Sequence, residues 1–599
     1  MALREMRETT MRRRWFSLAV AAGAGTALVL AGCAAESSDT DAAPGFEDCV
    51  ENPNECNTAD RADGGTMVWA LDQAPDGYFP WSSEGGSVYT LQAIHGILPY
   101  FGQFMPDGEY DYNMDVLAAE PELLSEDPFV VEFQLDEAAE WNDGTPISAD
   151  DVRITWMMST SEGEGHCEGC RPRATGNFDV IEDVSGSEDG KTVTITYKDG
   201  IAVPEWFSFG SAHNIIGGIA PAHVAEQQGW DIDTPSDLGE YFEYLNDNPA
   251  EFSGGPYLLE SFDIDTQVVK VPNPNWYGEV QPTLDRLVMR FLTDEDTWLP
   301  ALQNDELHGG SPAGFAEDVV RQVRDMEGVR VHIQPGPSWE HLDLNLDNQW
   351  LGEHQELREA IFVAVDAEDI ADRNFAAIFP DYQLRTNHVH SEDSEFHVDH
   401  LEGTGQGTGD VEMAREILEA AGFEGMDEGP GGLTYDGETV GPFRLRSTSA
   451  PARATAQQLI QGYLAEIGIE ANIEPTDDLG GTLVAQDYDL MQYGWSGSPL
   501  FTGIGSQYWE TGSSSNYGNY SNDEVDALIE QEQQAPTLEE SAALHDQMME
   551  LVVDDAYVLP LYDSPVYVFV SEDYANVRDN TNTSLRAMYE HHYWGEAAQ

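Results

Sequence analysis

The stretch from Phe133 to Trp156 constrains the fold of this chain more than any other part of its sequence. Apolar and polar residues alternate from Val131 to Leu135, which is the period of a half-buried β-strand. Asn142-Asp143-Gly144 then predicts a turn, because glycine accepts positive φ angles. Ser148 and Asp151 have the spacing of a capping box, which predicts a helix that continues through Trp156. A strand, a turn and a capped helix in this order indicate an α/β unit.

The complete pattern, F-x-L-x-x-x-x-x-W-x-D-G-x-P-x-x-A-x-D-V, resembles the signature of the extracellular solute-binding proteins of family five. These are the peptide- and nickel-type receptors of ABC importers. Further segments resemble that family in the same order; they are Ile219–His223, Gly254–Tyr257, Asn273–Tyr277, Leu357–Asp366 and Val558–Tyr562. The resemblance covers Gly65 to Val577. It implies an α/β, two-lobed periplasmic-binding-protein-like fold (type II, cluster C) with an extra N-terminal subdomain.

The resemblance also implies a chain that leaves the first lobe, builds the second and returns. We expect lobe one over residues 63–332, with an inserted subdomain at about 100–250, lobe two over 333–555, and a return to lobe one over 556–599. At 599 residues the chain is long enough for several cores. Two strands that cross between lobes form a hinge, and hinge closure around a solute is the mechanism of such receptors.

The N-terminus has the features of an export signal. Arg12-Arg13-Arg14 precedes an apolar run from Phe16 to Leu30, and Leu30-Ala31-Gly32-Cys33 has the form of a lipobox. We therefore expect a lipoprotein signal peptide over residues 1–32, lipidation of Cys33, and a lipid anchor that holds the exported protein at the outer face of the cytoplasmic membrane. An ordinary cleaved signal stays open, as does the choice between Sec and twin-arginine export.

Residues 33–62 are rich in Ser, Asp, Glu, Pro and Asn, which predicts a flexible tether. The chain has five cysteines, so four remain without Cys33. An even number in an exported protein suggests disulfides, most simply Cys49–Cys56 and Cys167–Cys170. The CxxC of the second pair could instead bind metal or carry redox chemistry. No second CxxC and no thioredoxin-like βαβ pattern accompanies it, so a structural disulfide is favoured.

The net charge of −85 excludes nucleic acid as a partner, because phosphate contacts need a basic face. A cationic ligand is one interpretation of this acidity. The acidic residues are spread over the whole chain instead of gathering in one segment, which favours general solvation of the surface, as in a salty habitat.

The sequence lacks the usual catalytic motifs. Gly494-Trp495-Ser496-Gly497 does not have the spacing of a nucleophile elbow, and HExxH, the P-loop and GxGxxG are absent. His388-Val389-His390, with His397 and His400, could form a metal cluster, but an acidic surface loop is the favoured interpretation. We expect no enzyme, no cofactor and no metal site; a hydrolase on an unrelated fold is the enzymatic alternative.

The resemblance also indicates where a ligand would bind. In the peptide receptors of family five, an Arg lies near the Gly-Trp pair, and an Asp three residues past the Trp binds the peptide's ammonium group. Gln492 and Ser498 stand at these positions here, so the charged clamp is not carried over. The predicted ligand contacts are Gln492, Tyr493, Gly494, Trp495, Ser498, Trp339, Tyr562, Tyr78 and Trp81.

Other roles for some of these residues stay open. Tyr78 and Trp81 could pack between a loop and lobe one, and Trp495 could be a core residue. Arg373 and Arg385 are scarce cations in an acidic chain and could meet a carboxylate or phosphate of the ligand. A surface ion pair of small energetic weight is the more ordinary role for each.

We therefore expect a monomeric, lipid-anchored receptor of an ABC importer, which captures a small-molecule or oligopeptide ligand between its lobes and delivers it to permease and ATPase subunits. The segment Met491–Ile529 resembles an actinobacterial lipoprotein branch of the family. That branch motivates two alternatives. One is a regulator or scaffold of envelope glycolipid synthesis that retains the receptor fold. The other is a receptor for an oligosaccharide or another non-peptide solute.

Overall fold

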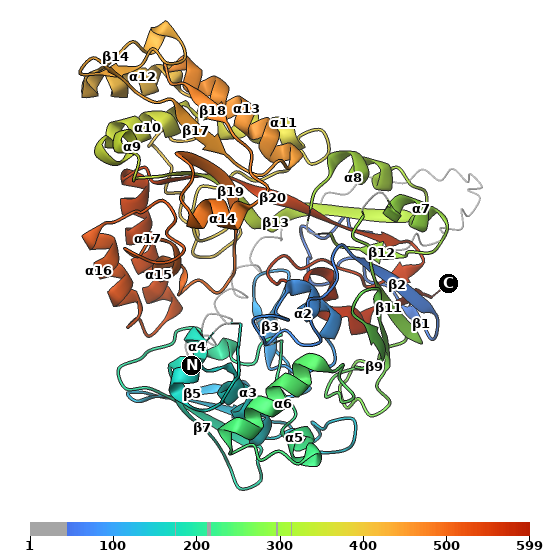
Figure 1. The fold of residues 1–599 in the computed structure, drawn as a ribbon. Helices are drawn as coiled ribbons and strands as arrows, with labels where there is room; N and C mark the ends of the chain where they lie inside the picture. The colour runs from blue at the N-terminus through green and yellow to red at the C-terminus, as the bar shows by residue number, and fades with distance from the viewer. Residues whose placement is uncertain (1–44, 174, 213–216, 295–296, 313, 599) are drawn as a thin grey trace, which may run out of the picture. The chain divides into compact units, whose positions relative to one another are not determined.

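A ten-stranded sheet runs through the protein in the computed structural model, which describes residues 45–598 except 174, 213–216, 295–296 and 313 (Figure 1). In spatial order its strands are β18 (Ala471–Ile473), β17 (Phe443–Arg446), β19 (Leu490–Ser496), β13 (Val329–Leu344), β20 (Val558–Ser571), β12 (Gly309–Gly310), β2 (Thr66–Leu71), β11 (Arg286–Phe291), β10 (Gln267–Pro272) and β9 (Tyr257–Asp263). The predicted two-lobed α/β fold class is confirmed.

Two long strands at the centre of this sheet carry the chain out and back. β13 has 16 residues and β20 has 14, and they pair antiparallel from Val329 opposite Ser571 to Asp343 opposite Val558. Figure 1 shows them side by side between the two sets of shorter strands. The expected passage out of lobe one near residue 333 and the expected return near residue 556 both fall at this pair. The expected start of lobe two, at residue 333, falls inside β13.

The predicted strand–turn–helix unit lies in a four-stranded sheet of order β5-β6-β8-β7. Its strands are β5 (Glu122–Glu126), β6 (Phe129–Gln134), β7 (Ile181–Gly186) and β8 (Thr192–Tyr197), and helix α3 (Ala149–Ser159) follows β6. Gly144 has φ +84°, as the turn requires. The capping box of Ser148 and Asp151 is present. The Asp151 carboxylate also accepts from the Ala222 N–H at 2.7 Å, so it joins α3 to the start of α5 (Ala222–Gln228).

Several short elements complete this part of the chain. They are β1 (Arg61–Ala62), α2 (Val88–Ile94), β3 (Gly102–Phe104), β4 (Tyr110–Tyr112), η1 (Glu162–Glu164), α4 (Gly176–Asp179), η2 (Trp206–Ser208), α5 (Ala222–Gln228), α6 (Pro235–Asp247), α7 (Trp298–Gln303) and α8 (Glu317–Arg324). After β20 come β21 (Tyr574–Ala575), η5 (Arg586–Tyr593) and β22 (Gly595–Ala597).

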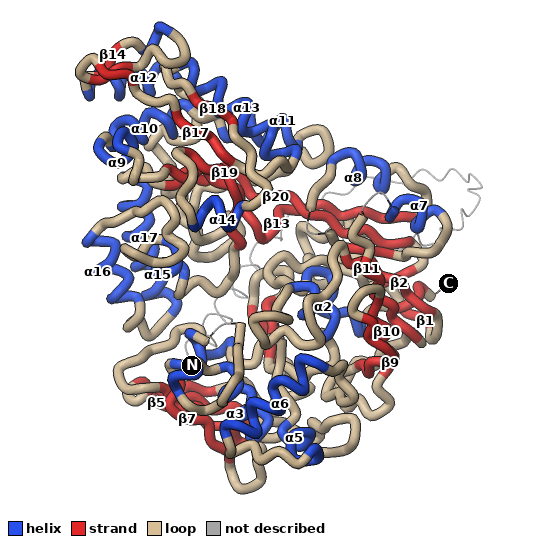
Figure 2. Tube along the Cα trace, viewed as in Figure 1, coloured by secondary structure: helices blue, strands red, loops and turns tan. Residues whose placement is uncertain are grey.

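Helices cover both faces of the sheet in lobe two (Figure 2). One face packs against α10 (Gln355–Ala364), α11 (Ala367–Phe375), α12 (Val411–Ala421) and α13 (Pro451–Glu466), and the other against α15 (Ile504–Tyr508), α16 (Asp523–Glu532) and α17 (Leu538–Asp554). The remaining elements are α9 (Gln349–Glu353), α14 (Leu479–Val484), β14 (Phe423–Glu424), η4 (Met426–Glu428), β15 (Thr434–Tyr435) and β16 (Glu438–Thr439). We call these two surfaces the α10–α13 face and the α15–α17 face.

The predicted flexible tether over residues 33–62 is wrong for its second part. Cys49 and Cys56 form a disulfide, and both side chains are buried in a core with Phe46. β1 pairs with β22, near the end of the chain. Buried apolar side chains and strand pairing hold residues 45–62 on lobe one, although the polar composition of the segment predicted nothing to bury.

The second predicted disulfide, Cys167–Cys170, is also present. The N–H of Glu168 donates to the carbonyl of Pro235 at 2.9 Å, at the start of α6, and the N–H of Arg173 donates to the carbonyl of Trp81 at 2.8 Å. The segment around this disulfide therefore joins α6 to the loop that carries Trp81. Both predicted pairings are confirmed.

The expected signal peptide and the lipidation site Cys33 lie outside the described residues. Within the described part of the chain, no helix combines the length and apolar character that crossing a bilayer requires.

The acidic surface leads to a prediction on salt. The chain has 111 acidic and 26 basic residues, so the folded protein repels itself. Raising NaCl from about 0.01 M to about 1 M shortens the Debye length from about 30 Å to about 3 Å. We expect the melting temperature, followed by calorimetry, to rise by several degrees. A flat or falling melting temperature would contradict this, and an equal rise in sucrose at low salt would indicate solvent exclusion instead of screening.

Candidate ligand-binding site

Three predicted ligand contacts meet on the α15–α17 face of the sheet. Trp339 of β13 lies opposite Trp495 of β19, and His341 lies opposite Tyr493. Because opposite residues of an antiparallel pair point to the same side, all four rings share this face. The Trp339 and Trp495 ring centroids are 5.4 Å apart, and Trp495 stacks on Tyr508 at 4.1 Å. With 2% and 7% exposed, Trp339 and Trp495 are core residues of the present conformation, as the alternative for Trp495 expected.

Two of these rings, those of His341 and Tyr493, contact the buried carboxylate of Asp343. The His341 Nδ1 and an Asp343 carboxylate oxygen are 2.5 Å apart, and the Tyr493 hydroxyl donates to the other oxygen at 2.9 Å. Burial, with the Asp343 charge adding to it, raises the pKa of Tyr493 well above its ordinary value. The phenol therefore stays protonated and acts as a donor. Neither His341 nor Asp343 was among the predicted ligand contacts, although their two-residue spacing places both on one face of a strand.

The other predicted contacts of this region lie on the α10–α13 face. Glu340 accepts from Arg453 of α13 at 2.6 Å and from the side-chain amide of Gln492 at 3.2 Å. Tyr562 of β20 lies opposite Glu340 and is 1% exposed. Gly494 leaves the space this ion pair needs, because a Cβ there would lie 2.9 Å from a Glu340 carboxylate oxygen. Gln492, which stands where the peptide receptors of family five are expected to carry an Arg, therefore donates to a buried glutamate.

Arg385 is not in a surface ion pair, contrary to the favoured prediction. It is buried, its Nη1 donates to Asp563 at 3.2 Å, and its other nitrogens donate to the carbonyls of Asn387 and Val389. Its guanidinium carbon lies 5.2 Å from the Trp339 ring centroid. Arg373, in contrast, makes the expected exposed pair, with Asp369.

His388 and His390 are buried, so the prediction of an acidic surface loop is wrong for them. Burial lowers the pKa of each to about 3. A neutral His388 donates from Nε2 to the carbonyl of Val558 at 2.9 Å. His400 lies beside Asp546 instead of joining a cluster. Across the described residues, no group of three or more His, Cys, Asp or Glu side chains has an arrangement that could hold a metal ion.

The remaining predicted contacts lie elsewhere. Ser498 is exposed in the loop after β19, where its hydroxyl accepts from the Leu500 N–H at 3.1 Å. Trp81 is 3% exposed and stacks on Phe79 in the core of the inserted subdomain. Tyr78 is half-buried, edge-on to Phe262. In this conformation Tyr78 and Trp81 therefore pack against neighbouring aromatic rings, in line with the alternative that they pack between a loop and lobe one.

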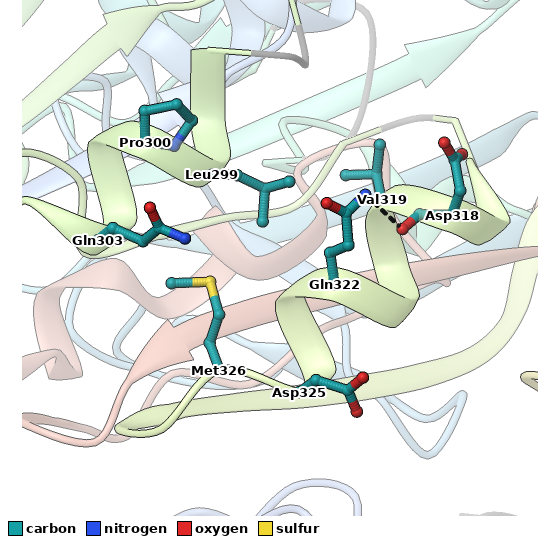
Figure 3. A pocket seen from close by; sticks show the side chains of 8 residues that line it. All are labelled: Leu299, Pro300, Gln303, Asp318, Val319, Gln322, Asp325 and Met326. Carbon is teal, nitrogen blue, oxygen red and sulfur yellow. Dashed lines mark hydrogen bonds between the residues drawn. The ribbon is translucent and has the colours of Figure 1, made fainter.

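A hollow in lobe one lies away from these residues. It has a volume of about 660 Å³ and opens between α7 and α8 (Figure 3). Its lining residues are Leu299, Pro300, Gln303, Asp318, Val319, Gln322, Asp325 and Met326. None of the nine predicted ligand contacts is among them.

Comparison with known proteins agrees with this topology. The family model of the bacterial extracellular solute-binding proteins, family 5 Middle, matches residues 115–517. The oligopeptide-binding protein OppA of Mycobacterium tuberculosis (strain ATCC 25618 / H37Rv) is 25% identical over 574 residues, which cover 94% of this chain and 91% of OppA.

Two solved structures extend the likeness. The periplasmic EDTA-binding protein EppA is 28% identical with a TM-score of 0.81, covering 91% of this chain and 99% of its own. The oligopeptide-binding protein AppA from Bacillus subtilis was solved in complex with a nonapeptide. It is 17% identical with a TM-score of 0.66, and the match covers 90% of this chain and 100% of AppA. The likeness to AppA concerns the fold alone.

Proposed function

We infer the function from one premise: this chain belongs to the bacterial extracellular solute-binding proteins of family 5. We propose that it is a lipid-anchored, monomeric receptor of an ABC importer, which captures a peptide-like solute outside the cytoplasmic membrane and delivers it to permease and ATPase subunits. The antiparallel pair β13 and β20 carries this proposal, because two crossing strands allow two lobes to close around a solute.

Three further observations support the proposal. The likeness to the oligopeptide-binding protein OppA extends over 94% of this chain. The Leu30–Cys33 segment has the form of a lipobox, which supports the anchor. The Glu340 carboxylate, which lies opposite Gly494, is held in an ion pair with Arg453, which suits binding without chemical change.

The proposal is tested by identifying what the purified protein carries. Mass spectrometry of the solute released on denaturation would be combined with a thermal-shift screen of peptides, oligosaccharides, EDTA and Ni²⁺. A peptide at about 100 times its Kd is expected to stabilise the folded state by about 2.7 kcal/mol. A screen in which peptides of every length leave the melting temperature unchanged would rule out the peptide-like solute.

A matched pair of tryptophan variants tests the site. Trp495 and Trp509 are both buried in the core of the α15–α17 face, and neither indole N–H has a hydrogen-bond partner among the described residues. We expect Trp495→Phe to weaken solute binding about tenfold, the equivalent of one hydrogen bond, and Trp509→Phe to leave it unchanged. Titration calorimetry with the solute identified above measures both. Equal Kd values for the two variants would remove Trp495 from the site.

A non-peptide solute is the second candidate. Gln492 and Ser498 stand where the peptide receptors are expected to carry charged residues, and Ser498 is exposed, so an ammonium group would find no carboxylate there. An oligosaccharide or a metal chelate would not need that clamp. Stabilisation by one of these compounds, with none by peptides, would favour this candidate.

A further inference from the structure

A glutamate of the inserted subdomain binds two backbone amides of lobe two. Glu205 lies between β8 and α5, and one of its carboxylate oxygens accepts from the N–H groups of Phe501 at 2.6 Å and Thr502 at 3.0 Å. Hydrogen bonds to an ionised acceptor are about twice as strong as neutral ones. Almost 300 residues separate these partners in sequence, and they belong to different lobes.

The subdomain holds Glu205 in a fixed place. Its carbonyl accepts from the Ser208 N–H at 2.9 Å and from the Ser208 hydroxyl at 2.8 Å, which closes the short helix η2. The neighbouring Phe207 ring lies edge-on to Tyr110 at 4.9 Å. A side chain on such a braced turn loses little freedom when it binds, so its hydrogen bonds keep more of their free energy.

The receiving loop is equally well anchored. Phe501 is 2% exposed, and its ring lies 4.6 Å from that of His390 and 5.5 Å from that of His545. Its carbonyl accepts from the N–H of Ile504, the first residue of α15. The same loop follows directly on β19, the strand that ends beside Trp495. Glu205 therefore binds the segment that follows the predicted ligand contacts of β19.

We propose that Glu205 is a latch that holds the two lobes closed and so retains the bound solute. The lobes are joined through β13 and β20, and rotation about these strands would move residues 501–502 away from the inserted subdomain. The carboxylate would then exchange two backbone donors for water. Glu205 acts by keeping the lobes closed around the solute and needs no contact with the solute itself. This inference rests on the proposed function, because only a receptor that opens and closes has a use for such a contact.

Amide hydrogen exchange tests the latch without any solute. In the purified full chain, Glu205→Ala is expected to raise the exchange rates of the Phe501 and Thr502 amides about tenfold or more, and Glu205→Gln, which keeps one acceptor oxygen but no charge, by less. Glu226→Ala is the matched control, because Glu226 is exposed on α5 of the same subdomain. Unchanged exchange at both amides in Glu205→Ala would overturn the proposal.

X-ray scattering separates a latch from a merely structural residue. A latch predicts a larger radius of gyration for Glu205→Ala with a melting temperature close to that of the parent protein. A lower melting temperature with an unchanged radius would show a structural role and overturn the latch. With the solute found by mass spectrometry, the variant should also release it about tenfold faster. If no solute is found, the proposed function fails, while exchange and scattering still decide whether Glu205 holds the lobes together.

Discussion

Replacing Arg385 by alanine is expected to lower the free energy of unfolding by about 3–5 kcal/mol, since it leaves a buried carboxylate without its cation. The Arg385 and Asp563 side chains are both 4% exposed and lie 3.2 Å apart. The substitution also removes the donors to the carbonyls of Asn387 and Val389, which shape the loop that carries His388. Urea denaturation followed by circular dichroism measures the loss as a lower midpoint.

Arg373→Ala is the matched control for this prediction. Its side chain is 56% exposed and pairs with Asp369 on the surface of α11, so the midpoint should stay within experimental error. The double variant Arg385→Leu with Asp563→Leu should recover part of the loss, because it removes the unpaired charge as well as its partner. Similar midpoints for Arg385→Ala and Arg373→Ala would show that the buried pair contributes no more than a solvated one.

Acidification from pH 7 to pH 5 is expected to destabilise the fold by about 2 kcal/mol for each of four histidines. Burial lowers the pKa of His95, His388, His390 and His592 to about 3, from an ordinary value of 6.5. Between these values the unfolded chain binds more protons than the folded one, so stability falls as the pH falls. Burial raises the pKa of Asp151 to about 7 and that of Asp563 to about 6, and these carboxyl groups act in the opposite direction.

His390→Phe isolates one histidine from this sum. The ring packs against Phe501 and Phe396, and its Nε2 has no hydrogen-bond partner among the described residues, so phenylalanine suits the site. The unfolding free energies of the variant and the parent protein are compared at pH 7 and pH 5. The loss on acidification should be about 2 kcal/mol smaller in the variant. The same loss in both proteins would contradict the assignment of proton uptake to His390.

Local sequence signals predicted the parts of the fold that depend on neighbouring residues. Period-two alternation identified β6, and the spacing of Ser148 and Asp151 identified the start of α3. The cysteine spacing suggested both disulfides. β13 continues through Gly336-Pro337, which give no strand signal of their own, because pairing with β20 before them and with β19 and β20 after them keeps the chain extended.

The arrangement of the predicted ligand contacts depends on pairing between strands. The sequence placed Trp339, Tyr493 and Trp495 near one another through a resemblance, and strand register brings them to one face. Alternation along β19 separates Gln492 from Tyr493, but the sequence gives no sign that Tyr562 and the Glu340–Arg453 pair share the face of Gln492. Register between strands depends on pairing across the sheet, which no single stretch of sequence encodes.

By itself, therefore, the sequence determined the order of strands and helices, the excursion into a second lobe and back, and the two cysteine pairs. The cysteine pairs follow from spacing along the chain, whereas the excursion into a second lobe follows from the resemblance of successive segments to family five. Only the tertiary structure decided that residues 45–62 pack on lobe one, that Arg385 is buried, and that Glu205 reaches Phe501. The physical reason is that a charge or a polar segment is buried only where partners compensate for its lost hydration, and those partners are distant in sequence. Arg385 and Asp563, for example, are 178 residues apart.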